Sequence, residues 1–225
     1  MKKIIFGIFA HPDDEAFGPS GTLLLETKAG TELHLISLTA GENGTNPDEY
    51  QDLGTVRLKE WHAAGKLIGA TSMHHLGYID GQLNNQAFLK IVEQIEELVR
   101  SYAQENVEIE FMTTDLNGVT GHIDHIVAAR AACFVFYKLK QAGLPMVRIR
   151  LACMPYSHFP QADINFVFME PGRQDSEINE TIDARSVVDE VYAIIRAHHT
   201  QRGDGDMHIA NRGDDVAINH FIVLT

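Results

Sequence analysis

Short apolar runs alternate with longer amphipathic stretches over the first 156 residues of the chain. The apolar runs are rich in β-branched and aromatic residues, which is typical of buried strands. The longer stretches carry apolar residues every three or four positions, which is typical of helices that pack by one face. We expect strands near residues 3–10, 31–39, 73–76, 107–113 and 148–156, and helices near 18–29, 53–68, 86–104 and 122–142. This order predicts an α/β fold, a Rossmann-like three-layer α/β/α arrangement around a mostly parallel sheet.

The pattern weakens after residue 156. We expect short strands or a hairpin at 164–169 and 177–182, a helix at 185–199, a mobile loop at 203–215 and a last strand at 216–224. Because no linker or low-complexity tract interrupts the chain, we interpret residues 1–225 as a single domain. Its core spans about residues 1–156. The remainder, about residues 157–225, is a smaller β addition that we expect to shape the ligand pocket.

Four polar clusters each follow a predicted strand end, at residues 11–15, 41–44, 80–81 and 115–125. The carboxyl ends of parallel strands meet at one edge of a sheet, and ligands of such folds bind there. The topology alone therefore predicts that these clusters converge on one rim.

The first cluster combines one imidazole with three carboxylates, in the run His11-Pro12-Asp13-Asp14-Glu15. A His and an Asp three residues apart can supply two of the three protein ligands of a catalytic zinc site, and they leave the neighbouring Asp for chemistry. The alternative is a solvated acidic turn that caps a helix. His122 and His125 stand one turn apart on a predicted helix, and such a pair alone is more often structural. Their common place at strand ends of one sheet favours a metal site.

Composition narrows the range of partners. The formal charge of −13 argues against nucleic acid and anionic membrane surfaces, which repel an acidic protein. No stretch approaches the ~20 apolar residues of a membrane span, and the first apolar run lacks a signal cleavage site. Cys133 and Cys153 each lie in an apolar stretch, which is typical of buried thiols in a reducing compartment. We expect a cytoplasmic protein without membrane insertion, and a homo-oligomer stays open.

Two motifs give the chain a resemblance to a known family. Residues 10–15, Ala-His-Pro-Asp-Asp-Glu before a helix, together with His122-x-Asp124-His125, resemble the PIG-L/LmbE-like family of zinc-dependent N-deacetylases. Secondary motifs of the family are similar to Leu38-Thr39-x-Gly41-Glu42-x-Gly44, Arg57-x-x-Glu60 with Leu67-x-Gly69, Leu76-Gly77-Tyr78-x-Asp80-Gly81-x-Leu83, and His198-His199-Thr200-Gln201. The resemblance covers about residues 4–201.

The resemblance implies a hydrolase that removes the acetyl group from N-acetylglucosamine-containing small molecules. His11, Asp14 and His125 match the metal ligands of the family, and Asp13 matches its general base. Zn²⁺ is the implied metal, although the same ligands also suit Fe²⁺. His122 matches a second catalytic histidine that polarises or protonates at the reacting carbonyl.

Further residues have weaker assignments. Asp124 is expected in the catalytic machinery behind a ligand histidine, or else as a carboxylate favoured by the helix dipole. Arg57 matches an arginine that contacts the substrate, with a surface salt bridge as the alternative. Glu42 is suited to bind sugar hydroxyls, or else is solvated. His198 is expected beside the substrate or as a cation at a helix C-terminus.

One departure from the family pattern keeps other functions open. Thr120 occupies a position near Gly121-His122 where some members carry a tyrosine as an oxyanion donor. The second hypothesis is therefore a metal-dependent amidase acting on a different amide, such as a thiol-sugar conjugate. The third is a non-catalytic carbohydrate-binding protein with a structural metal, which has no need to retain Asp13. The leading hypothesis is the zinc-dependent N-deacetylase.

Overall fold

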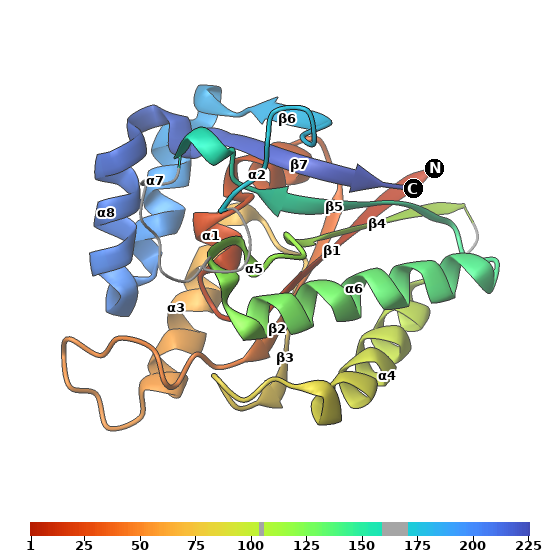
Figure 1. Cartoon of the computed structure of the whole chain (residues 1–225), viewed down its shortest axis with the longest axis horizontal. Helices are drawn as coiled ribbons and strands as arrows, with labels where there is room; N and C mark the ends of the chain where they lie inside the picture. The colour runs from red at the N-terminus through yellow and green to blue at the C-terminus, as the bar shows by residue number, and fades with distance from the viewer. Residues whose placement is uncertain (104–105, 159–170) are drawn as a thin grey trace.

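A mostly parallel sheet of seven strands forms the centre of the described part of the chain (Figure 1). The computed structural model describes residues 1–103, 106–158 and 171–225. The strands are β1 (Lys2–Phe9), β2 (Glu32–Thr39), β3 (Ser72–Tyr78), β4 (Val107–Thr114), β5 (Met146–Cys153), β6 (Glu180–Asp183) and β7 (Ile218–Leu224). Their order is β3-β2-β1-β4-β5-β7-β6. Strands β1 to β5 run parallel, whereas β7 runs antiparallel to both of its neighbours.

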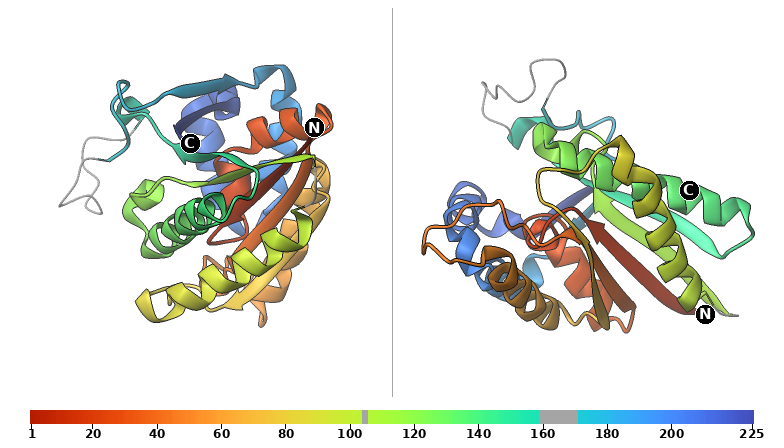
Figure 2. Two further views of the ribbon diagram at one scale, coloured as in Figure 1. Left: turned by 90° about the vertical axis from the view of Figure 1, so that its right-hand side faces the viewer. Right: turned by 90° about the horizontal axis from the view of Figure 1, so that it is seen from below.

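Helices cover both faces of the sheet (Figure 2). The α-helices are α1 (Asp14–Phe17), α2 (Ser20–Lys28), α3 (Leu53–Ile68), α4 (Asn85–Tyr102), α5 (Gly118–Gly121), α6 (Ile123–Gln141), α7 (Val188–Ala197) and α8 (Arg202–Arg212), and the 3₁₀ turns are η1 (Tyr156–His158), η3 (Arg185–Val187), η4 (His199–Gln201) and η5 (Gly213–Ala217). Helices α4 and α6 pack on one face, and α2, α3 and α7 pack on the other. Within the described ranges, no helix is long and apolar enough to cross a membrane.

The core consists of two apolar layers, one on each face of the sheet. Successive side chains of a strand point to opposite faces. In β1, Phe6 and Ile8 therefore join the layer under α4 and α6, whereas Ile5 and Phe9 join the layer under α2, α3 and α7. All four side chains are fully or almost fully buried. Strand β1 is held on both faces, so the turn that follows it starts from a rigid support.

The predicted α/β fold with a mostly parallel sheet is confirmed. The main difference in the first half is at the acidic cluster, where the chain turns helical earlier than expected. Helix α1 already begins at Asp14, and Pro19 separates it from α2. The acidic residues thus lie in the first turn of a short helix directly after β1.

The loop predicted at residues 203–215 is wrong, because these residues form most of α8 and η5. Helix α8 lies beside α7 (Figure 1). A Cβ at Gly205 would lie 3.1 Å from Ile195 Cγ2 and 3.5 Å from Phe17 Cε1, so the glycine allows a close approach to α7 and α1. This packing outweighs the low helix propensity of glycine. The strand predicted at 164–169 lies outside the described residues.

Candidate active site

The predicted site residues gather where the strand order changes direction. From β1 the chain builds β2 and β3 on one side and then crosses to β4 and β5 on the other side. The segments after β1 and β4 therefore diverge and leave a crevice, in which ligands of such folds bind. One segment carries His11 to Asp14, and the other carries His122 to His125.

The turn after β1 has an unusual backbone conformation. Asp13 has φ 132° and ψ −21°, a combination that L-residues rarely adopt. Asp14 stabilises the turn because its Oδ2 accepts hydrogen bonds from the backbone N–H groups of Ala10 and His11, both at 3.0 Å. Strain that the surrounding structure enforces is typical of functional positions.

Donor atoms of the three predicted metal ligands face one another. His11 Nδ1 lies 3.0 Å from His125 Nε2 and 3.9 Å from Asp14 Oδ2. His125 Nε2 lies 3.1 Å from Asp14 Oδ1. Two imidazole nitrogens and a carboxylate form a ligand set of catalytic zinc sites. The structure therefore brings His11, Asp14 and His125 together as a candidate metal centre.

The outer nitrogens of the two imidazoles indicate that this centre requires a cation. His125 Nδ1 donates to Gly118 O at 3.0 Å, because a carbonyl oxygen can only accept. His11 Nε2 faces two carboxylates, at 3.0 Å from Asp80 Oδ1 and 3.4 Å from Asp124 Oδ2. In the neutral tautomers that these contacts assign, both inner nitrogens carry lone pairs. Two lone pairs beside a carboxylate repel one another unless a proton or a metal ion lies between them, so the donors fit a divalent metal ion.

The electrostatic surroundings of His11 also favour a cation. Burial by itself lowers the pKa of His11, but hydrogen bonds to Asp124 and Asp80 raise it overall to about 10. Burial by itself raises the pKa of Asp14, but His125 and His11 bring it below its usual range. Groups that stabilise a proton on His11 also stabilise a metal ion in its place.

Asp124 and Asp80 form an outer layer behind His11. Asp124 is 1% exposed, and its carboxylate accepts the backbone N–H groups of Gly81 at 2.7 Å and Leu83 at 3.1 Å. Such outer carboxylates fix the tautomer and orientation of a ligand histidine. Asp80, Asp124 and His11 also lie close enough together to be a metal-binding group, but the backbone bonds of Asp124 favour the outer role. Sequence reasoning placed Asp80 in a cluster on this rim but assigned it no role, because an Asp-Gly pair is typical of a turn.

Arg57 holds Asp13 in place. Its Nη2 donates to Asp13 Oδ2 at 2.7 Å and to Pro12 O at 2.8 Å, and its Nη1 donates to Gly41 O at 2.7 Å. The Arg57 side chain is 4% exposed. Burial raises the pKa of Asp13 to about 6, and the charge of Arg57 opposes that shift. A Cβ at Gly44 would overlap this guanidinium, which gives the glycine motif after β2 a packing reason.

His122 caps helix α6 and is exposed. Its Nδ1 accepts the backbone N–H of Asp124 at 3.2 Å, so the neutral ring carries its proton on Nε2. Burial, together with His125 and His11, lowers the pKa of His122 and favours the neutral ring near pH 7. Its ring centroid lies 4.9 Å from those of both His11 and His125, which makes His122 an alternative metal donor. Because the cap occupies Nδ1, we favour Asp14 as the third ligand.

The segment between β4 and α6 is strained next to these histidines. Val119 has φ 61° and ψ −57°, which is rare for a β-branched residue. Asn117 Oδ1 accepts the Val119 N–H at 2.9 Å and supports this conformation. Thr120, which follows, is exposed. Nothing in the sequence pattern signalled this strain.

Glu42 and His198 contact other groups of the protein. Glu42 Oε1 accepts the backbone N–H of Asp80 at 3.1 Å. His198 is 1% exposed, and its Nε2 lies 3.0 Å from Glu15 Oε1. Burial by itself lowers the pKa of His198, but Glu15 raises it overall. Contact of Arg57, Glu42 or His198 with a substrate stays a prediction.

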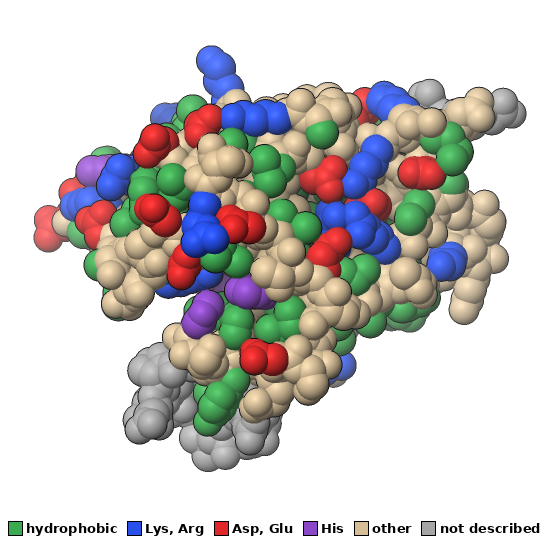
Figure 3. All heavy atoms as spheres, turned by 90° about the horizontal axis from the view of Figure 1, so that it is seen from above, with side chains coloured by type: hydrophobic (Ala, Val, Ile, Leu, Met, Phe, Trp, Pro, Cys, Tyr) green, Lys and Arg blue, Asp and Glu red, His purple; other side chains and the backbone are tan. Residues whose placement is uncertain are grey.

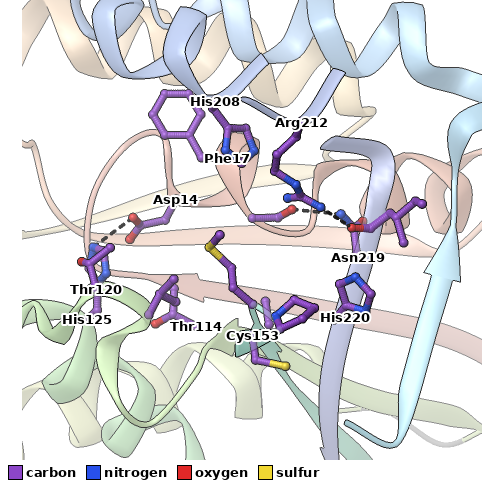
Figure 4. Close-up of a pocket in the computed structure, with 16 residues that line it drawn as sticks. Asp14, Phe17, Thr114, Thr120, His125, Cys153, His208, Arg212, Asn219 and His220 are labelled. Atoms are coloured by element: carbon purple, nitrogen blue, oxygen red, sulfur yellow. Dashed lines mark hydrogen bonds and ion pairs between the residues drawn. The ribbon is translucent and has the colours of Figure 1, made fainter. Parts of the chain in front are cut away.

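A cavity of about 230 Å³ lies beside the candidate metal centre (Figure 4). Asp14, His125 and Thr120 line one end of it. His208 and Arg212, both from α8, are among the residues that line the rest (Figure 4). The cavity thus connects two predicted metal ligands with the C-terminal helix.

The fold and the site together define a class. An α/β sheet carries a His₂Asp donor set at its switch point, with a carboxylate and an imidazole donor beside it. This arrangement is typical of metal-dependent hydrolases, in which three protein ligands leave a position for water.

Comparison with known proteins identifies the family. The family model described as PIG-L, GlcNAc-PI de-N-acetylase, matches residues 6–136. This match spans more than half of the chain, so the chain belongs to the PIG-L family. The predicted family and its enzyme class, N-deacetylase, are confirmed.

Curated relatives agree with this assignment, and a solved structure shares the fold. A protein of Acidothermus cellulolyticus named 1D-myo-inositol 2-acetamido-2-deoxy-alpha-D-glucopyranoside deacetylase is 29% identical, over 89% of this chain and 80% of the relative. "Probable N-acetyl-alpha-D-glucosaminyl L-malate deacetylase 2" of Bacillus subtilis is 24% identical, over 89% and 84%. The fold is similar to N,N'-diacetylchitobiose deacetylase from Pyrococcus horikoshii, with a TM-score of 0.70 and 17% identity over 99% of this chain and 84% of that structure.

Proposed function

We propose that this chain uses a bound Zn²⁺ to remove the acetyl group from an N-acetylglucosamine-containing small molecule. The observation that carries the proposal is the convergence of His11 Nδ1, His125 Nε2 and the Asp14 carboxylate beside a cavity. The relatives named as deacetylases of a glucosaminyl inositol and a glucosaminyl malate support the substrate class.

The metal ligands in this proposal are His11, Asp14 and His125. When bound, Zn²⁺ lowers the pKa of water to roughly 7 and polarises the acetyl carbonyl. Asp80 and Asp124 engage the Nε2 side of His11, so its Nδ1 presents a lone pair inward.

In this proposal, Asp13 transfers the proton. Arg57 holds its Oδ2 at 2.7 Å, which fixes the carboxylate at the end of the strained turn. The carboxylate accepts a proton from the water that attacks the acetyl carbon. It then returns that proton to the amide nitrogen as the C–N bond breaks, so that acetate and a free amine leave.

His122 stabilises the developing charge on the carbonyl oxygen. His122 Nδ1 accepts the backbone N–H of Asp124, so the neutral ring carries its proton on Nε2. This Nε2–H can donate a hydrogen bond to an oxyanion. One such donor contributes roughly 3 kcal/mol to the transition state. Thr120 stands at the cavity wall where it can add a shorter hydroxyl donor.

Arg57, Glu42 and His198 support the site from behind in this proposal. Arg57 orients Asp13, Glu42 holds the backbone of the Asp80 turn, and His198 pairs with Glu15 under α1. The cost of holding Asp13 at φ 132° argues against a purely carbohydrate-binding protein, which gains nothing from it.

The test is acetate release from a panel of N-acetylglucosamine glycosides by the zinc-loaded protein and by its Asp13→Asn variant. We expect turnover that falls by about 10²–10⁴-fold in the variant, because a general base typically contributes that much. Metal analysis should find the same zinc content in both proteins, since Asp13 is not a ligand. The control is Asp183→Asn, which changes a half-exposed carboxylate on β6.

Each result has a defined meaning. Wild-type turnover in Asp13→Asn rules out the assigned base. No acetate from any glycoside, with zinc bound, rejects this substrate class and moves the assignment to another amide. The same panel assayed after iron loading decides between Zn²⁺ and Fe²⁺.

A further inference from the structure

Arg212 is a cation on the cavity wall that lacks an anionic partner among the described residues. Its Nη2 donates to the backbone oxygens of Asp215 at 2.6 Å and Ile218 at 3.0 Å. Its Nε is buried and has no hydrogen-bond partner in the part of the chain that the structure describes. The carboxylate of Asp215 lies 3.5 Å from Arg185 Nη1 instead.

Among the described residues, the other buried or half-buried arginines each contact a carboxylate. Arg57, Arg150 and Arg173 each contact a carboxylate at 2.7 Å. On the face shown in Figure 3, acidic and basic side chains are interspersed. In a chain with a formal charge of −13, carboxylates are plentiful, so a half-buried guanidinium that pairs with none of the described ones is informative.

No carboxylate of the described residues forms an ion pair with Arg212, although the charge of Asp215 acts on it from a distance. His208 Nε2 is also buried and has no hydrogen-bond partner within residues 1–103, 106–158 and 171–225. Burial lowers the pKa of His208 to about 4, so the ring is neutral at pH 7. Burial lowers the pKa of Arg212 as well, and the charge of Asp215 opposes that shift only in part. A partly buried charge is unfavourable until an opposite charge pairs with it.

The same cavity reaches the candidate metal centre. Asp14 and His125 line it together with His208 and Arg212. In Figure 4 the Arg212 side chain extends from α8 into the region that the lining residues surround. If the amide of a ligand lies next to the predicted metal ligands, the rest of that ligand can therefore extend along the cavity toward Arg212.

We propose that Arg212 binds a carboxylate carried by the substrate, so that the preferred substrate is an N-acetylglucosaminide with an acidic aglycone rather than a neutral polyol. The inference rests on the proposed function for its reacting group. The guanidinium supplies a charge-assisted hydrogen bond to the carboxylate, and His208 Nε2 accepts a hydrogen bond from an adjacent hydroxyl of the same ligand.

A matched pair of substrates tests the proposal. Acetate release is measured from N-acetylglucosaminyl L-malate and from its neutral dimethyl ester, with zinc-loaded protein. We expect kcat/KM to be about 10–100-fold higher for the acid, mostly through KM, because hydrogen bonds to charged groups are the strong ones. In Arg212→Gln the ratio of the two values should fall to near one. Arg196→Gln is the control, because Arg196 is exposed on α7 and contacts the Tyr192 ring.

A second measurement keeps the test valid if Arg212→Gln folds poorly. Free L-malate should inhibit hydrolysis of the dimethyl ester competitively in the wild-type protein, and the inhibition should weaken as salt rises. Arg212→Lys, which keeps the charge but loses the planar fork, should retain part of the preference.

The inference is overturned if the wild-type protein uses acid and ester equally and L-malate does not inhibit. It is also overturned if a folded Arg212→Gln lowers both values by the same factor, since that indicates a structural role. If neither substrate is hydrolysed, the proposed function fails separately. Calorimetric titration of L-malate into wild-type and Arg212→Gln protein then decides on the anion site alone.

Discussion

Two clusters of buried charged groups in this chain differ in whether they are complete. Around Arg150, on β5, cations and carboxylates alternate: the guanidinium lies 2.7 Å from Glu180, 2.9 Å from Glu26 and 3.3 Å from Glu110. Lys3 adds a further cation, 2.8 Å from Glu26. The chain supplies both signs of charge for this cluster.

No Lys or Arg of the described residues forms an ion pair with the three predicted ligands of the candidate metal centre. His11 Nδ1, His125 Nε2 and the Asp14 carboxylate present acceptors to one another, and their outer atoms are already engaged. The comparison teaches that buried charge by itself does not mark a functional site. A stronger indication of a functional site is a set of buried acceptor groups that face one another without a cation from the described residues.

The largest effect is expected when one of the facing donors is removed. His125→Ala should lose nearly all bound zinc, and turnover should fall by at least about 10⁴-fold, beyond the range of a single general base. Added zinc should raise the Tm of metal-free wild-type protein but not that of the variant, because only the intact centre binds the ion in the folded state. Metal analysis and thermal unfolding measure this. Full zinc content in His125→Ala would place the metal elsewhere and remove the contrast between the two clusters.

A substitution in the Arg150 cluster should lower the stability of the fold but leave catalysis unchanged. Arg150→Met leaves three carboxylates without their central cation, and the Arg150 side chain is only 4% exposed. We expect the free energy of unfolding to fall by about 3–5 kcal/mol, measured by urea titration, with kcat and zinc affinity unchanged in the folded protein. Arg148→Met is the matched control: its side chain is 25% exposed and shares Glu110 and Glu180, so a loss below about 1 kcal/mol is expected. Equal losses in the two variants would show that Arg150 is not the centre of the cluster.

The fold was predictable because its signals are local. Strand and helix periodicity in residues 1–156 reports which faces are buried, and alternating elements leave few topologies. The convergence of the candidate metal ligands was predictable for a similar reason, since His11 and Asp14 lie in one turn and His125 lies in one short motif; their role as ligands stays a prediction. Family membership and the N-deacetylase class followed from those motifs.

The remaining features depend on contacts between distant segments. Helix α8 forms because Gly205 packs against Ile195 and Phe17, which glycine content alone does not reveal. The tight pairing of His198 with Glu15 joins residues far apart in the chain. Asp80 belongs to the same group: its Asp-Gly pair signals a turn, and only the assembled sheet shows that the turn places a carboxylate against His11.

The smallest effect is expected for Asp80, and it tests whether residues behind the three predicted ligands contribute to the candidate metal centre. Asp80→Asn keeps the shape of the side chain but replaces a carboxylate 3.0 Å from His11 Nε2 by a neutral amide. We expect zinc affinity or turnover to weaken by about 10–100-fold, as for other outer partners of ligand histidines, or roughly 1.4–2.7 kcal/mol. Competition with a chromogenic chelator measures the zinc Kd, and Asp183→Asn is the control on the surface. Because Asp124 also faces His11 Nε2, at 3.4 Å, a residual effect near tenfold means that the two carboxylates share the task. An unchanged zinc Kd and turnover would restrict the centre to its three facing donors and return Asp80 to a turn former.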